Sequence, residues 1–195
     1  MTLMNESSII NHIASESYID AENVKALFNL MELKHISKNS YLCKKGDIEP
    51  YLYYVTYGCL LTYYEDENQG KHVIQFGIEK WWTGDLGAFN KEQNVNYNIK
   101  TLENSSIYFL SKSNFEYACA NIPQVEYYFR LLFQKSLVSH QKRLIGMISM
   151  SGTERYLDFL KHHPHLVLTV PQKYIASYLG MTPEFLSKIR GKIGE

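Results

Sequence analysis

Apolar positions near the end of the chain recur at helical spacing in two short runs. In the first run, over 172–179, Ile175, Ala176 and Leu179 share one face of a helix. The second run, over 183–190, consists of Phe185, Leu186 and Ile189. The runs predict two short amphipathic helices that pack against each other, with the small Ala176 at their closest approach.

The residues between these runs are those that a tight turn between helices needs. Gly180 suits a left-handed position after the first helix. Thr182 is a good cap for the second helix, Pro183 suits its first position, and Glu184 puts an acid near the positive end of the helix dipole. This order predicts a helix-turn-helix that reads the DNA major groove, with an incidental helical hairpin as the alternative.

The middle of the chain alternates short apolar and aromatic runs with turn residues. The runs that read as strands are 51–57, 60–64, 71–76, 97–102 and 107–110. Amphipathic spacing over 9–33 predicts one or two helices before them. Short strands at regular intervals predict an antiparallel β-roll of the jelly-roll type with flanking helices, and therefore the α+β class.

A long helical pattern follows over 123–150, with Pro123 at its head. Its apolar face is broader than packing on one sheet requires and comprises Tyr128, Leu131, Leu132, Leu137, Leu144, Ile145 and Ile148. Lys135, Lys142 and Arg143 lie on its other faces. We expect a dimerisation helix, and the alternative is a helix that packs only on its own sheet.

Two shorter helices complete the pattern. A capping box over 113–116 predicts that one helix begins at Ser113. Another is expected over 154–162, started by Thr153 and ended by Pro164, with Tyr156, Leu157 and Leu160 facing inward. The predicted division is a β-roll sensor over 1–122, a linker and dimerisation helix over 123–150, and a DNA-binding domain over 151–195.

Charge separates the same two halves although the net charge of the 195 residues is zero. Residues 1–129 hold 10 Lys and no Arg against 16 acids, a balance of −6, whereas 130–195 hold 10 Lys and Arg against 4 acids, a balance of +6. The basic half coincides with the helix-turn-helix, as polyanion binding would require. Chance imbalance on solvated faces is the alternative.

Composition narrows the setting of the protein. No apolar run approaches the roughly 20 residues that span a bilayer, and residues 1–6 do not read as a secretory signal. The three cysteines, Cys43, Cys59 and Cys119, are scattered, so we expect buried thiols in a cytoplasmic protein rather than disulfides or redox sensors.

The order of elements resembles the CRP/FNR family of bacterial transcription regulators over nearly the whole chain. The resemblance is carried most strongly by 155–160 and 170–190, and more loosely by the turn glycines Gly58, Gly70 and Gly84. It implies a homodimer with a signal-sensing N-terminal domain and a C-terminal domain that binds double-stranded operator DNA. RNA polymerase is a candidate further partner, and no membrane is expected.

The sensing domain departs from the cyclic-nucleotide-binding members of that family. Those members carry a Gly-Glu-Leu turn, whose Glu holds the ribose, and an Arg that holds the phosphate. Here the turn is Gly84-Asp85-Leu86, the later segment 94–99 lacks an Arg, and residues 1–129 contain none. A guanidinium fork binds phosphate better than Lys91 or Lys100 would. We therefore expect that the sensing domain does not bind cyclic AMP, and we expect no cofactor.

An effector pocket for another ligand remains a candidate beside this turn. Its expected lining is Trp82, Gly84, Asp85, Leu86 and Tyr97. For the adjacent aromatic pair Trp81 and Trp82, the alternative is a role in the core.

A further departure from the family is the absence of residues for a two-stranded wing after the second helix of the helix-turn-helix, so we expect fewer phosphate contacts and modest DNA affinity.

The resemblance also indicates which residues read DNA. Thr182, Glu184, Ser187, Lys188 and Gly191 point away from the apolar face of the second helix. By resemblance Glu184 accepts from cytosine N4 and Lys188 reads guanine, whereas Pro183 replaces a family arginine. The phosphate contacts are expected from Gln172, Lys173, Arg190 and Lys192. A solvated helix face is the alternative for each charge, and helix capping is a second one for Glu184.

Other chemistry has weak support. His72 stands alone in the roll, and the cluster His162, His163 and His165 follows a helix end, so no metal site is expected. No nucleophile elbow, P-loop or dinucleotide fingerprint is present, so no enzyme is expected. The competing function is a ligand-sensing or protein-interaction module whose helix-turn-helix does not bind DNA specifically.

Overall fold

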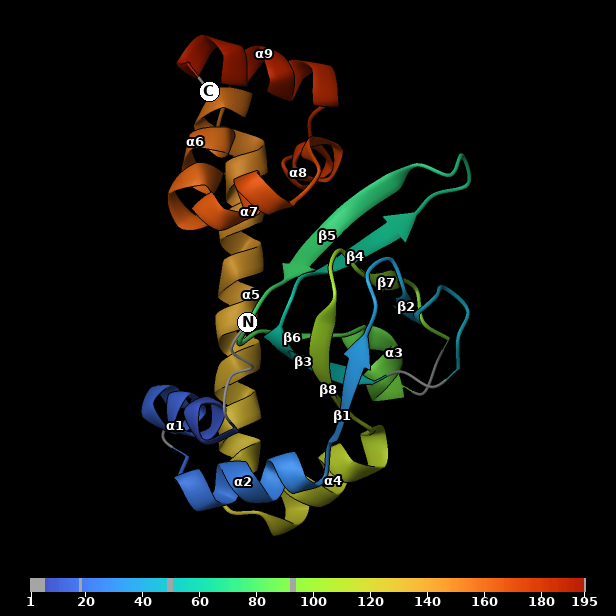
Figure 1. Ribbon diagram of the computed structural model, residues 1–195, viewed down its shortest axis with the longest axis vertical. Helices are drawn as coiled ribbons and strands as arrows, with labels where there is room; N and C mark the ends of the chain where they lie inside the picture. The colour runs from blue at the N-terminus through green and yellow to red at the C-terminus, as the bar shows by residue number, and fades with distance from the viewer. Residues whose placement is uncertain (1–5, 18, 49–50, 92–93, 195) are drawn as a thin grey trace.

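The computed structural model describes residues 6–17, 19–48, 51–91 and 94–194. Figure 1 shows one long helix, α5 (Val125–Ser149), running along the molecule, with a β-roll beside it and a group of short helices at its C-terminal end. Helices α1 (Glu6–Ser17) and α2 (Ala21–Asn29) lie at the opposite end of α5. Within the described residues, no helix has the length and apolarity needed to cross a membrane.

The roll consists of two antiparallel sheets, which confirms the α+β prediction. Their strand orders are β1-β8-β3-β6 and β2-β7-β4-β5. The strands are β1 (Glu32–Ile36), β2 (Tyr41–Cys43), β3 (Leu52–Tyr57), β4 (Leu60–Glu65), β5 (Lys71–Gly77), β6 (Trp82–Thr83), β7 (Asn98–Thr101) and β8 (Ser105–Leu110).

Each of the five predicted strand segments contains a strand in the structure. Strands β1, β2 and β6 and the helix α3 (Leu86–Lys91) were not predicted, because segments this short carry little periodicity of their own. They form because neighbours along the sheets supply their hydrogen bonds. Strand β1, for example, pairs along its whole length with β8.

The N-cap of the helix α4 (Lys112–Asn121) lies two residues before the expected one. Ser111, not Ser113, is the N-cap, and its hydroxyl accepts a hydrogen bond from Asn114 N at 3.2 Å. The long helix then begins at Val125 after Gln124, whose backbone has a φ of 69°. The Gln124 Oε1 accepts from Asp20 N at 2.7 Å and so fastens the start of α2 to the start of α5.

The helices after α5 differ from the prediction in two ways. Ser151, not Thr153, caps α6 (Gly152–His162) in a reciprocal capping box with Glu154. Pro164 does not merely end that helix but starts another, α7 (Pro164–Thr169), as a proline at a first helical position can. Leu157, expected to face inward, is 46% exposed.

The apolar core shows how the two halves of the molecule meet. One cluster joins α1, α2 and the start of α5 to the roll. A second cluster contains roll residues of β4 and β5 such as Leu61, Val73 and Phe76 together with Tyr156, Ile175 and Leu186 of the C-terminal helices. The C-terminal helices therefore share a core with the roll in this conformation.

Candidate DNA-reading helix and effector cavity

The helix-turn-helix geometry matches the local signals in its sequence. Helix α8 (Gln172–Tyr178) and helix α9 (Pro183–Ile193) are joined through Gly180, whose φ is +66°. The positive φ favours glycine there, whereas a Cβ would meet only the flexible end of Met147, at 2.9 Å from its Cε. The Thr182 hydroxyl accepts from Phe185 N at 3.2 Å and caps α9.

Helix α9 lies at the outer end of the molecule (Figure 1). Its inner positions Leu186 and Ile189 are 0% and 3% exposed. The expected base-reading residues are all exposed, namely Thr182, Glu184, Ser187, Lys188 and Gly191. Phe185, expected in the apolar stripe, is instead 47% exposed. Its ring lies over Gly152, where a Cβ would be 2.5 Å from the Phe185 Cε1.

The four expected phosphate contacts are in different situations. Lys173 and Lys192 are exposed, whereas Arg190 and Gln172 are partly buried. The Gln172 Nε2 donates to the Pro183 carbonyl at 3.1 Å. Gln172 thus links the starts of α8 and α9, a structural role that spacing alone did not indicate.

Glu184 has a capping interaction as well as an exposed position. Its own backbone N–H, followed by the Thr182 side chain, lowers the pKa of the Glu184 carboxyl below the usual value. The capping alternative therefore describes at least part of what this acid does.

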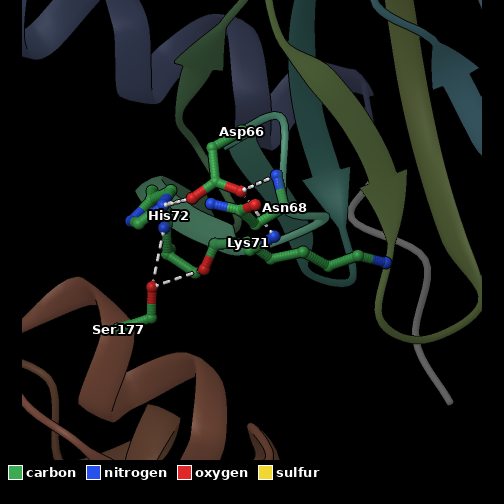
Figure 2. A network of polar contacts seen from close by, with 7 residues as sticks. Asp66, Asn68, Lys71, His72 and Ser177 are labelled. Carbon is green, nitrogen blue, oxygen red and sulfur yellow. Dashed lines mark hydrogen bonds and ion pairs between the residues drawn. The ribbon is translucent and has the colours of Figure 1, made fainter.

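The C-terminal helices are fastened to the tip of the β4–β5 hairpin, as Figure 2 shows. The Ser177 hydroxyl of α8 donates to the Lys71 carbonyl at 2.8 Å and accepts from Val73 N at 2.9 Å. At the hairpin turn Asp66 accepts from Asn68 N at 2.9 Å, and its other oxygen lies 2.6 Å from His72 Nε2. Because β5 is an edge strand, its outward N–H and C=O groups are free for Ser177.

Arg143 strengthens the same junction, and sequence reasoning did not find it. Its Nη1 donates to the Ile74 carbonyl at 2.6 Å, and its Nη2 donates to the carbonyls of Val73 and Tyr178 at 3.0 and 2.9 Å. Its guanidinium lies over the Tyr178 ring, with Cζ 4.1 Å from the ring centroid. Burial lowers the pKa of Arg143 from its usual value, but a guanidinium stays charged at neutral pH.

Arg155 has a corresponding role inside the C-terminal unit. Its Nε donates to the Leu179 carbonyl at 3.0 Å, and its Nη1 donates to the Met150 carbonyl at 2.8 Å. These carbonyls end α8 and α5, so Arg155 satisfies helix C-termini that would otherwise lack partners.

The structure gathers the expected effector-pocket residues around one cavity of about 770 Å³. Trp82, Gly84, Asp85, Leu86 and Tyr97 all line it. The opposite wall is α5, and the C-terminal helices also contribute to the lining. Gly84 is required by a close approach, since a Cβ there would lie 2.8 Å from the Tyr51 carbonyl.

Two of these pocket residues have most of their polar groups engaged. Asp85 is 3% exposed. Its carboxylate accepts hydrogen bonds from Ala88 N at 3.1 Å and from Asn96 N at 2.7 Å. The Trp82 Nε1 donates to the Tyr128 hydroxyl at 2.7 Å. Asp85 therefore stabilises the start of α3 and the 94–97 loop instead of offering a free acceptor for a ribose.

The expectation that the effector site has no arginine is wrong, because an arginine from outside residues 1–129 reaches the cavity. Arg143 of α5 lines it, although residues 1–129 contain no arginine, and neither Lys91 nor Lys100 does. The sequence held a signal for this: Ser136, Ser139 and Arg143 recur at spacings of three and four, one helical face. The fork of Arg143 is nevertheless occupied by backbone carbonyls, so it is not free for bidentate phosphate binding.

The expected dimerisation residues divide into two groups. Tyr128 is 5% exposed and packs into the core of its own chain, which removes it from the proposed seam. Leu131 and Leu132 are half-buried, and Leu132 lines the cavity. The remaining members are exposed in the single chain: Leu137 59%, Leu144 58%, Ile145 61% and Ile148 78%.

The cysteines and histidines show no arrangement for other chemistry in the described part of the chain. Burial raises the pKa of Cys43 to about 11 and that of Cys59 to about 12. Thiols with such values are poor redox sensors. Among the described residues, no cluster of His, Cys, Asp and Glu could hold a metal ion.

Comparisons with known proteins place this architecture. Residues 33–121 match the model of the cyclic nucleotide-binding domain. The chain is 22% identical over 189 residues to an anaerobic regulatory protein of Pasteurella multocida, a match that covers 90% of this chain and 68% of that relative.

Solved structures with the same fold include proteins from two other bacteria. The c-di-GMP-responsive global regulator CLP of Xanthomonas campestris superposes with a TM-score of 0.71 at 15% identity, covering 90% of this chain and 92% of CLP. FixK2 of Bradyrhizobium japonicum gives 0.74 at 15% identity over 84% of each chain.

The fold is thus that of a cyclic nucleotide-binding-type roll joined by a long helix to a helical C-terminal unit. The domain match and the shared fold confirm the resemblance to the CRP/FNR family.

Proposed function

We propose that the protein is a homodimeric transcription regulator that reads operator DNA with α9 and is controlled by an effector in the cavity. The observation that carries the proposal is the polar face of α9. This helix is capped by Thr182, supported from behind by Leu186, and exposes its polar side chains at the outer end of the molecule. Such a helix meets the geometric needs of a major-groove reader.

Base contacts are proposed for Thr182, Glu184, Ser187 and Lys188, and phosphate contacts for Lys173, Arg190 and Lys192. An ammonium can reach guanine O6 and N7, so Lys188 is proposed to specify one base pair. Gln172 is proposed to support this surface by fastening α9 to α8, in view of its bond to the Pro183 carbonyl.

The test begins with selection of bound sequences from a random duplex pool, followed by affinity measurements on the selected site and on random DNA. We expect salt-dependent binding, because neutralised phosphates release counterions. Lys188→Ala should cost about 1–3 kcal/mol on the selected site and less on random DNA. The matched control, Lys161→Ala, changes an exposed lysine of α6 that is outside the proposed surface.

Equal losses on both DNAs would reassign Lys188 to a phosphate. If no salt-dependent duplex binding occurs, the DNA-reading proposal is wrong and the protein-interaction alternative is favoured.

Dimerisation is proposed through the exposed apolar residues of α5. Leu137, Leu144 and Ile148 are spaced seven and four residues apart, as in a paired-helix seam. Sedimentation equilibrium should show a dimer for the parent chain and a monomer for the double variant L144E/I148E. The control variant K161E should remain a dimer. A monomeric parent chain would contradict this part of the proposal.

Effector control is proposed from the composition of the cavity wall. The roll, α5 and the C-terminal unit all line the same space, the last through His163 and Tyr178. A ligand there would contact the sensing half and the DNA-reading half together, so it could favour one arrangement of them over another.

A further inference from the structure

The cavity has an excess of positive charge. Its cationic or protonatable lining residues are Lys80, Lys135, His140, Arg143 and His163. The acid in the lining is Asp85, and both of its oxygens are occupied by backbone N–H groups. Among the residues that the structure describes, none of the three permanent cations forms an ion pair with a carboxylate.

Arg143 shows the imbalance most clearly. Its guanidinium is held by three neutral carbonyl oxygens, and its Nε is buried without a hydrogen-bond partner among the described residues. A charge taken out of water is costly unless an opposite charge compensates it. The cavity beside it is a place from which an anion could supply that compensation.

The rest of the lining is apolar and aromatic. The roll contributes Trp81 and Trp82 to the lining, and α5 contributes Leu132 and Phe133. A volume of about 770 Å³ is within the range of small-molecule sites. A ligand that satisfied both parts of this lining would combine a negative group with an apolar body.

We propose that the cavity binds an organic anion with an apolar or aromatic body, and that its negative group is held by Lys135 and the neighbouring cations, not by the Gly84-Asp85 turn. The inference rests on the proposed function only in placing the effector in this cavity. Lys135 offers a point charge, which accepts carboxylates and phosphates alike, while the fork of Arg143 stays on the backbone and adds its positive field.

The chain contains a built-in reporter for this site. Trp81 and Trp82 are its two tryptophans, and both line the cavity. Tryptophan emission can therefore be titrated with a matched series of probes: 3-phenylpropanoate, 3-phenylpropan-1-ol and 3-phenylpropylamine, with phenyl phosphate to separate carboxylate from phosphate. We expect both anions to bind about tenfold or more tighter than the alcohol, the amine more weakly still.

Two variants of α5 locate the charge. Lys135→Gln should weaken 3-phenylpropanoate binding about fivefold, as expected for one partly screened ion pair, and leave the alcohol unaffected. Lys142→Gln is the control, since Lys142 is on the same helix but does not line the cavity. Far-ultraviolet circular dichroism checks that both variants fold.

The proposal is overturned if the alcohol or amine binds as tightly as the anions, if both lysine variants lose affinity equally, or if no probe binds at millimolar concentration. Tighter binding of phenyl phosphate would identify phosphates as the ligand class, and the reverse order carboxylates. Salt-dependent duplex binding without any anion response would refute this inference and leave the DNA-reading proposal intact. Anion binding without duplex binding would refute the DNA-reading proposal and support this inference.

Discussion

The contact between α8 and the edge of the roll can be tested through Ser177. Its hydroxyl makes two hydrogen bonds to the backbone of β5, one to Val73 N at 2.9 Å and one to the Lys71 carbonyl at 2.8 Å. The Val73 bond is partly buried and contributes about 1 kcal/mol, and the exposed Lys71 bond contributes about 0.5 kcal/mol. Ser177→Ala should therefore lose about 1.5 kcal/mol of contact energy.

Alanine also favours the helix by about 0.5 kcal/mol over serine, so the net loss in the free energy of unfolding is about 1 kcal/mol. Ser187→Ala on α9 is the matched control, because Ser187 is exposed and gains only the helix propensity. Urea unfolding followed by circular dichroism measures both variants. We expect Ser177→Ala to be about 1.5 kcal/mol less stable than Ser187→Ala. A difference below about 0.5 kcal/mol would show that Ser177 does not stabilise this junction.

Three further predictions concern the turn, the histidines and the ligand. In thermal unfolding, Gly180→Ala should destabilise the protein by about 1–2 kcal/mol, because its backbone is left-handed. Gly191→Ala is the control; it places a Cβ in open space and should be neutral or stabilising. Burial lowers the pKa of His140, and the positive charge of Arg143 lowers it further. Burial also lowers the pKa of His163; His165 and His162 lower it further, whereas Asp158 raises it. The unfolded chain then binds more protons below pH about 6.5, so the free energy of unfolding should fall as pH drops from about 7 to about 5. The partly buried His163 should contribute more to this fall than the exposed His140. The double variant H140Q/H163Q should flatten this dependence, and an unchanged slope would exclude these groups. Titration calorimetry with cyclic AMP and cyclic GMP should show no tight binding, since Asp85 and the Arg143 fork are both engaged; micromolar affinity would contradict that reasoning.

Short-range signals in the chain were sufficient for the helix-turn-helix. Gly180, Thr182 and Pro183 act on backbone groups within a few residues, so their effects do not depend on the rest of the fold. The same holds for the strand segments and for the long helix. All depend on periodicity, which is a local property of the sequence.

The partners of the polar side chains depended instead on contacts between distant segments. Arg143 meets β5 and α8 because the C-terminal part of α5 lies against both the roll and the C-terminal helices. Tyr128, near the start of α5, accepts a hydrogen bond from Trp82 of the roll because that part of the helix packs on the roll. Local spacing shows which helix face a residue occupies. It does not show what that face will contact. Packing between distant segments determines which carbonyl oxygens accept hydrogen bonds from a buried charged side chain, and where a cavity remains between the elements.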